Sequence, residues 1–128
     1  MPESEKITIN LGAVDLGKID LLVSESHYSN RTDFIRAAIR TQLDKHQFDV
    51  EQSMARDAFV IGALRYGRPG LERMKREGKR LKLRVIGMLS IAADVPADLA
   101  SEVIESVWVR GMFKASDAVK GALANRME

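Results

Sequence analysis

The stretch Lys6-Ile7-Thr8-Ile9-Asn10-Leu11 alternates polar and apolar residues without exception. This period of two, together with its β-branched residues, is typical of a β-strand with one buried face. We therefore predict a strand over residues 5–11. Its buried face would carry the three apolar side chains, Ile7, Ile9 and Leu11. Its opposite face would carry the three polar side chains, Lys6, Thr8 and Asn10.

Two amphipathic helices are predicted directly after this strand. Gly12-Ala13-Val14 ends the alternation, and Asp15 can cap a first helix that continues to about residue 27. Ser29 and Asn30 are good N-cap residues for a second helix, which we expect to end near residue 46. A lone strand leaves both of its edges unpaired. We therefore expect it to pair antiparallel with the same strand of a second subunit, so that the dimer shares one core.

A second folding unit is predicted after a short connector at residues 47–54. We expect a basic helix at 71–79, a turn at 93–98, a final helix that Ser116 caps, and three strands at residues 58–66, 81–92 and 102–112. This order predicts a small α+β sandwich with helices on one face of the sheet. The chain shows no internal repeat. We assign residues 1–47 and 55–128 to two domains.

The composition excludes several classes of protein. Hydrophobic residues make up 45% of the chain and charged residues 30%, which is the profile of a soluble globular protein. No apolar run approaches the roughly 20 residues that span a bilayer, and the acidic N-terminus is unlike a secretory signal. We therefore expect a cytoplasmic protein with no membrane partner.

The chemistry of the side chains is equally restrictive. The chain has no cysteine, which removes disulfides, thiolate nucleophiles and sulfur ligands for metals. No residues assemble a nucleophile with its base. We therefore expect neither an enzyme nor a bound cofactor.

The basic charge of the chain is local. The formal net charge is only +2, but residues 65–84 are strongly basic. This segment has three interpretations: a solvated face, an additional surface for DNA phosphates, or a site for an anionic effector. For the last two, the candidate contacts are Arg68, Arg73, Lys75, Arg76, Lys79 and Arg80.

The polar face of the predicted strand suits base recognition. Lysine donates to guanine, asparagine can pair with adenine through two hydrogen bonds, and threonine offers a hydroxyl and a methyl group. The start of the second helix adds free backbone N–H groups, a positive dipole end and the Arg31 side chain, which together suit a phosphate. The alternative is that the three polar residues are only the solvated face of an amphipathic strand.

Residues 5 to about 46 resemble the ribbon-helix-helix family of transcriptional regulators. The resemblance rests on the strand at residues 6–11 and on Ser29-Asn30-Arg31-Thr32-Asp33-Phe34-Ile35-Arg36-Ala37-Ala38-Ile39-Arg40. In that family two chains form an intertwined dimer whose β-ribbon enters the major groove of double-stranded DNA. The resemblance implies base reading by Lys6, Thr8 and Asn10. It implies phosphate binding by Ser29, Asn30 and Arg31.

The order of elements after residue 55 resembles the ACT-like regulatory domain of the nickel-responsive ribbon-helix-helix repressors, which assembles dimers into a tetramer. The resemblance implies a ferredoxin-like βαββα fold. Those proteins bind nickel through histidines and a cysteine, whereas this chain has neither residue after His46. Met88 and Ser90 stand where ligand histidines are expected, and they cannot form a square-planar nitrogen and sulfur site. We therefore expect the architecture without a metal.

Three functions are compatible with these features. The first is a sequence-specific repressor or autoregulator that works as a dimer of dimers on a repeated operator. The second is an antitoxin whose residues 55–128 bind a toxin. Such segments are usually disordered when free, which the strong strand patterns here argue against. The third, compatible with the first, is a sensor whose second domain binds a small-molecule effector, such as an amino acid, and thereby changes DNA affinity.

Overall fold

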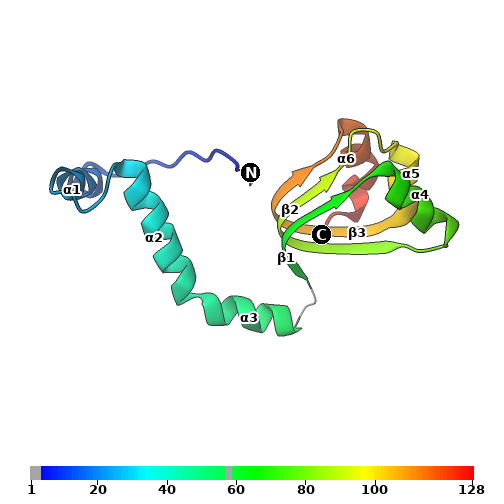
Figure 1. The fold of residues 1–128 in the computed structure, drawn as a ribbon, viewed down its shortest axis with the longest axis horizontal. Coiled ribbons are helices and arrows are strands. Elements are labelled where there is room, and N and C mark those ends of the chain that lie inside the picture. Colours follow the sequence, from blue (N-terminus) through cyan, green and yellow to red (C-terminus); the bar gives the residue numbers. More distant parts are fainter. Residues whose placement is uncertain (1–3, 57–58) are drawn as a thin grey trace. The chain divides into compact units, whose positions relative to one another are not determined.

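A computed structural model describes residues 4–56 and 59–128, which belong to two compact units, Met1–Arg56 and Asp57–Glu128. Ala58, the first residue of the predicted strand 58–66, lies outside the described residues. Figure 1 shows the order of the elements along the chain. In the part that is described, no helix is both long enough and apolar enough to cross a membrane.

The first unit contains three helices: α1 (Ala13–Ser24), α2 (Arg31–Lys45) and α3 (Gln47–Arg56). The predicted cap of α2 is confirmed, because Asn30 is extended and its side-chain oxygen accepts a hydrogen bond from the Asp33 N–H. The N-cap of α1 is Gly12, so this helix begins before the Asp15 that the sequence favoured. Asp15 instead lies in the first turn, where its charge complements the helix dipole.

The expectation of a connector at residues 47–54 is wrong, because α3 occupies this segment. Only His46 interrupts the two helices, and the Val50 N–H already donates to its carbonyl. The His46 ring lies 2.9 Å from an oxygen of Asp49, and Gln47 donates to Glu51. These contacts along the first turns of α3 stabilise a helix in a segment that has neither glycine nor proline.

The second unit is a parallel three-stranded sheet with a helix after each strand. Its elements are β1 (Val60–Tyr66), α4 (Arg68–Arg76), β2 (Leu81–Ile91), α5 (Ala97–Val103), β3 (Ile104–Lys114), α6 (Asp117–Leu123) and a 3-10 turn at Ala124–Arg126. The strand order is β1-β2-β3, and both pairs are parallel. The predicted N-cap of α6 is confirmed, since the Ser116 side chain accepts from the Val119 N–H.

The expected βαββα order is wrong, and the ACT-like resemblance is not confirmed. The segment between the second and third strands contains α5 in addition to the predicted turn, and β3 begins at Ile104 instead of Glu102. Parallel strands need such a crossover, because a tight turn can join only antiparallel neighbours. Helix α4 also begins earlier than expected, with Pro69 in its first turn, where proline is tolerated.

The three strands are structural repeats, so the expectation of no internal repeat is wrong as well. Val60-Ile61-Gly62-Ala63-Leu64, Val85-Ile86-Gly87-Met88-Leu89 and Val109-Arg110-Gly111-Met112-Phe113 lie side by side in exact register. The period is about 25 residues, which is within the range of solenoid repeats built from one supersecondary unit each. Each repeat is therefore a strand followed by a helix, stacked on the next one.

The core of this unit lies between one face of the sheet and the helices. Its strand contribution comes from alternate positions such as Leu83, Val85 and Leu89. Helices α4, α5 and α6 cover these positions with the buried side chains Leu71, Leu99, Ala100, Val103, Val119 and Leu123. The intervening strand residues, including Ile86, Met88 and Met112, point to the opposite face and are only half-buried.

Candidate nucleic-acid interface

The N-terminal segment exposes both of its predicted faces in a single chain. Lys6, Thr8 and Asn10 are exposed, and so are Ile7 and Ile9, with 74% and 57% of their surface accessible. Residues 4–12 form no helix or strand within the chain. The strand predicted at residues 5–11 is thus not formed in the single chain, and its pairing with a second subunit stays a prediction.

The helices of the first unit leave apolar hollows beside this segment. One hollow of about 390 Å³ is lined by Ile9, Leu11, Ile19, Phe34, Ile35, Ala38, Ile39 and Gln42. A second, of about 430 Å³, lies alongside and shares Leu11, Ile19 and Phe34. Of the side chains described between residues 4 and 56, only that of Ile19 is buried. A single copy of this unit thus has no closed core of its own.

The start of α2 is organised by a reciprocal pair of hydrogen bonds. Asn30 Oδ1 accepts from the Asp33 N–H at 2.8 Å, and Asp33 Oδ2 accepts from the Ser29 N–H at 3.0 Å. The N–H groups of Arg31 and Thr32 are the first two of the helix and have no intrahelical acceptor. They are exposed and lie at the positive end of the helix dipole, so they can bind an anion.

Arg31 forms an ion pair that the sequence reasoning missed. Its Nε donates to Asp20 Oδ1 at 2.7 Å, and its Nη2 donates to Asp20 Oδ2 at 2.8 Å. The hydrogen bonds raise the pKa of Arg31 and lower the pKa of Asp20 from their ordinary values. This bidentate pair joins α1 to the start of α2. No local spacing could reveal it, because the two residues lie on different helices.

The basic residues of α4 are partly neutralised. Arg68 Nε donates to Glu72 at 2.8 Å, and Lys75 lies 2.6 Å from Glu102. These hydrogen bonds raise the pKa values of Arg68 and Lys75. Lys79 pairs with Glu77 at 3.1 Å. The other three predicted cations, Arg73, Arg76 and Arg80, are exposed and form no ion pair with any residue in the described ranges.

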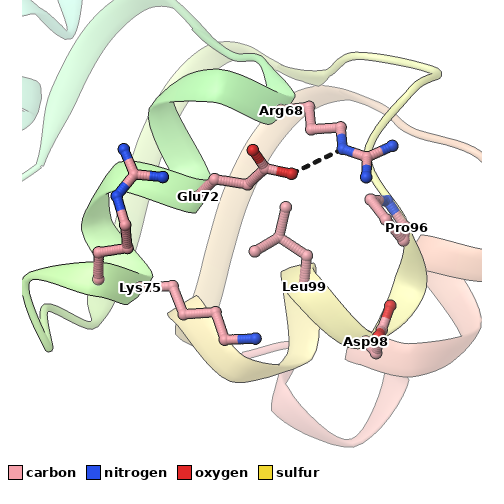
Figure 2. Close-up of a pocket in the computed structure, with 7 residues that line it drawn as sticks. Arg68, Glu72, Lys75, Pro96, Asp98 and Leu99 are labelled. Carbon is pink, nitrogen blue, oxygen red and sulfur yellow. Dashed lines mark hydrogen bonds and ion pairs between the residues drawn. The ribbon is translucent and has the colours of Figure 1, made fainter.

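A shallow pocket of about 450 Å³ lies between α4 and α5 (Figure 2). Arg68, Glu72, Lys75 and Arg76 line it from α4, and Pro96, Asp98 and Leu99 line it from the other side. Its charged walls carry both signs, and Leu99 supplies a buried apolar contact. The basic segment that was considered as a site for an anionic effector thus contributes to a pocket whose side chains carry both charges.

Trp108 stands on the sheet face that the helices do not cover. The guanidinium of Arg84 lies 4.7 Å from its ring centroid and that of Arg110 lies 4.4 Å away, both within cation–π range. Phe59 contacts the same ring at a centroid distance of 5.6 Å. These two cationic neighbours lie on β2 and β3, and their approach to the ring depends on the pairing of the two strands.

Met88 and Ser90, which the resemblance placed where ligand histidines are expected, are half-buried on β2. Residues 4–56 and 59–128 contain no group of three or more histidine, cysteine, aspartate or glutamate side chains placed to hold a metal ion.

Comparison with known proteins extends over both units. The model of the Ribbon-Helix-Helix transcriptional regulator family matches residues 2–120. No curated protein and no solved structure matches the chain. The family match includes the N-terminal segment, the two helices after it and all three strands of the sheet. The chain belongs to the ribbon-helix-helix family of transcriptional regulators, whose members bind DNA and act as oligomers.

Proposed function

We propose that this protein is a cytoplasmic, sequence-specific DNA-binding repressor whose dimer reads the major groove with a two-stranded β-ribbon. The observation that carries the proposal is the first unit's exposed N-terminal segment, which has apolar residues on one face and hydrogen-bonding residues on the other. The family to which the chain belongs supports DNA binding in general. The repressor role, the ribbon and its contacts are our inference.

The proposed dimer supplies the core that one chain lacks. Pairing the N-terminal segments of two chains would cover the apolar hollows that Ile9 and Leu11 already line and would bury Ile7, Ile9 and Leu11 between the chains. Full burial of side chains of this size stabilises by about 1.5–3 kcal/mol each. Because three such residues come from each chain, dimerisation and folding of this unit are coupled.

The same pairing would place Lys6, Thr8 and Asn10 on the outer face of the ribbon. These residues come every second position along the segment, so all three project together toward base edges. Asn10 has the most specific chemistry, because a carboxamide can donate to and accept from adenine at the same time. We assign base reading to these three residues.

The start of α2 would fix the depth and register of the ribbon by binding a phosphate. The capped turn at Ser29 and Asn30 presents the N–H groups of Arg31 and Thr32 in a defined direction. The Arg31 side chain is held by Asp20, so the backbone N–H groups make the main contact and the guanidinium contributes through its remaining donors. This contact carries no sequence information.

Selection of bound DNA from a random pool tests the proposal. We expect the wild-type protein to enrich a repeated half-site, and Asn10→Ala to change the preferred base at one position of each half-site by a factor equivalent to about 1–3 kcal/mol. Asn125→Ala, the same substitution at an exposed residue of the second unit, serves as the control and should keep the wild-type preference. Identical preferences for Asn10→Ala and wild type would refute base reading by the ribbon.

The phosphate clamp has a different signature. Arg31→Ala should weaken binding to all sequences alike and lower the steepness of the salt dependence by up to about one unit, because each phosphate contact releases about 0.9 counterion. Retention of the wild-type salt slope would exclude a phosphate contact by the Arg31 guanidinium and leave only the backbone contact.

We assign the second unit to assembly into dimers of dimers and to effector sensing. The pocket between α4 and α5 is the candidate effector site, and Arg73, Arg76 and Arg80 are the cations left for additional contacts with DNA. We prefer this assignment to an antitoxin, because residues 60–128 have a closed hydrophobic core of their own and do not need a toxin to order them. A thermal-shift screen on the full chain should find compounds that also change DNA affinity.

A further inference from the structure

The repeats of the second unit stack into a short solenoid that has two different ends. A repeat buries its strand edge only against a neighbouring repeat, so the first and last repeats of a stack need a cap. In this unit the ends of the stack are the outer edges of β1 and β3.

The β3 end is capped by the chain itself. Met127 forms a parallel bridge with Val107, and the Glu128 N–H donates to the Val107 carbonyl at 2.7 Å. Arg126 Nη1 donates to the Ile104 carbonyl at 2.8 Å and also bonds the Ser101 carbonyl. The last residues of the chain thus fold back on the amino end of β3 and fix it.

The β1 end has no such cap among the described residues. Its outer edge pairs with no strand of the described ranges, and Val60 and Ile61 are 45% and 53% exposed. An exposed apolar strand edge of this kind is a template for pairing with another strand.

The glycines of the repeats show how closely a backbone can approach this edge. A Cβ on Gly87 would lie 2.1 Å from the Gly62 carbonyl oxygen, and a Cβ on Gly111 would lie at the same distance from the Gly87 oxygen. No described atom lies within 4 Å of the corresponding position on Gly62. The position beside Gly62, at the outer edge of β1, is therefore open.

We propose that β1 of one chain pairs antiparallel with β1 of a second copy, across a two-fold axis, to join the two three-stranded sheets into one. The partner of the outer edge of β1 is a second copy of the chain, because two such edges are complementary to each other. The strand Val60-Ile61-Gly62-Ala63-Leu64-Arg65-Tyr66 has one charged residue, and an isologous contact closes with two chains. Head-to-tail stacking is disfavoured because residues 127–128 already occupy the outer edge of β3 at Val107.

The charges on the strand fit this arrangement. Maximum overlap of two seven-residue strands places the axis at the central residue, Ala63, so that Arg65 of one chain lies opposite Ile61 of the other. The two Arg65 side chains are then about 14 Å apart along the strands, at about 3.4 Å per residue. This separation exceeds the Debye length of about 8 Å at physiological salt, so the like charges are screened.

The inference does not rest on DNA binding, and it places the pairing in the second unit. In the proposed repressor, the pairing would join second units of two N-terminal dimers into a dimer of dimers, and formation of one such contact would raise the effective concentration for the other to the millimolar range. The pairing can therefore be weak in isolation and complete in the full chain.

Cysteine cross-linking of the full chain tests the pairing, because the protein contains no cysteine and any disulfide of a single-cysteine variant joins two chains. A disulfide needs Cα atoms within about 7 Å. We expect Ala63→Cys, at the axis, to form a covalent dimer under mild oxidation. Val60→Cys is the control: it is exposed on the same strand, but its two copies would be about 20 Å apart.

The expected result is that Ala63→Cys cross-links at least ten times faster than Val60→Cys at equal concentration. Equal rates, or a faster rate for Val60→Cys, would overturn the proposal, because tethering through the N-terminal unit alone does not distinguish the two positions. Circular dichroism checks that each variant folds.

If Ala63→Cys does not fold, an equimolar mixture of Ile61→Cys and Arg65→Cys provides the same test. The mixed disulfide between the two variants should then exceed the sum of the two homodimers. A statistical mixture would overturn the proposal. Measurement of the oligomeric size of the wild-type protein separates the β1 pairing from the N-terminal dimer. If the wild type is oligomeric and the cysteine variants do not cross-link, β1 pairing is refuted and the N-terminal dimer is unaffected.

Discussion

Substituting the aligned glycines by alanine should destabilise the second unit in a graded way. Gly62 and Gly87 have φ angles of +136° and +130°, a region that side chains rarely adopt, so alanine at either position costs about 1–3 kcal/mol of backbone strain. Since the two φ values are nearly equal, this cost is nearly the same at both. The environments differ, because a Cβ meets nothing within 4 Å on Gly62 and the Gly62 carbonyl oxygen at 2.1 Å on Gly87.

The contact at Gly87 can be relieved only by moving β1 away from β2. That movement breaks hydrogen bonds around the contact, each with a net value of about 1 kcal/mol, so loss of two adds about 2 kcal/mol to the strain. Gly87→Ala should therefore lower the free energy of unfolding by about 4 kcal/mol, against about 2 kcal/mol for Gly62→Ala. Domains are commonly stable by about 5–15 kcal/mol, so the Gly87 variant would be close to unfolding.

Urea denaturation followed by tryptophan fluorescence measures the difference. Trp108 is the only tryptophan of the chain and lies on β3, so its signal reports the second unit. Free energies of unfolding for Gly62→Ala and Gly87→Ala within about 0.5 kcal/mol of each other, the usual range of a neutral surface change, would refute the reasoning. They would mean that the approach of Gly62 to Gly87 imposes no packing constraint.

Three further predictions concern the first unit. Asp20→Asn should release the Arg31 guanidinium and raise DNA affinity at low salt. Titration of the wild type and the variant against the same DNA measures this change, and equal affinities would contradict the prediction. Because the pKa of Asp20 is lowered in the folded state, its stabilising effect is present at neutral pH and is lost as the pH falls through that pKa, so Asp20→Asn should flatten the acid limb of the stability profile. Asn30→Ala should remove the α2 cap and cost about 1 kcal/mol by thermal melting, whereas Asn125→Ala should cost little.

Local signals were sufficient for much of the fold. Asn30 and Ser116 were predicted as N-caps, and both accept the expected backbone hydrogen bond, because capping depends on residues only three positions apart. The family was already indicated by the alternation at residues 6–11 and by the start of the second helix. The roles of Lys6, Thr8 and Asn10 stay predictions, since they require a second chain and DNA.

The repeat can be read in the sequence once the strands have been aligned. The pattern of valine, glycine and a large apolar residue at alternate positions recurs at Val60, Val85 and Val109, and its glycines line up in the sheet. Helix α5 is a different case. It has only seven residues, which is too short for a helical period to stand out, and α3 was hidden by its polar composition.

Sequence alone determined what depends on neighbours along the chain: the caps of α2 and α6, the approximate positions of the three strands of the second unit, the family and the absence of cysteine chemistry. The tertiary structure decided which strands are parallel, which face of the sheet the helices cover, and that Arg31 binds Asp20. These features depend on contacts between residues far apart in the sequence. For the same reason the open edge of β1 became visible only in three dimensions, because an edge exists only once the neighbouring strands have been placed.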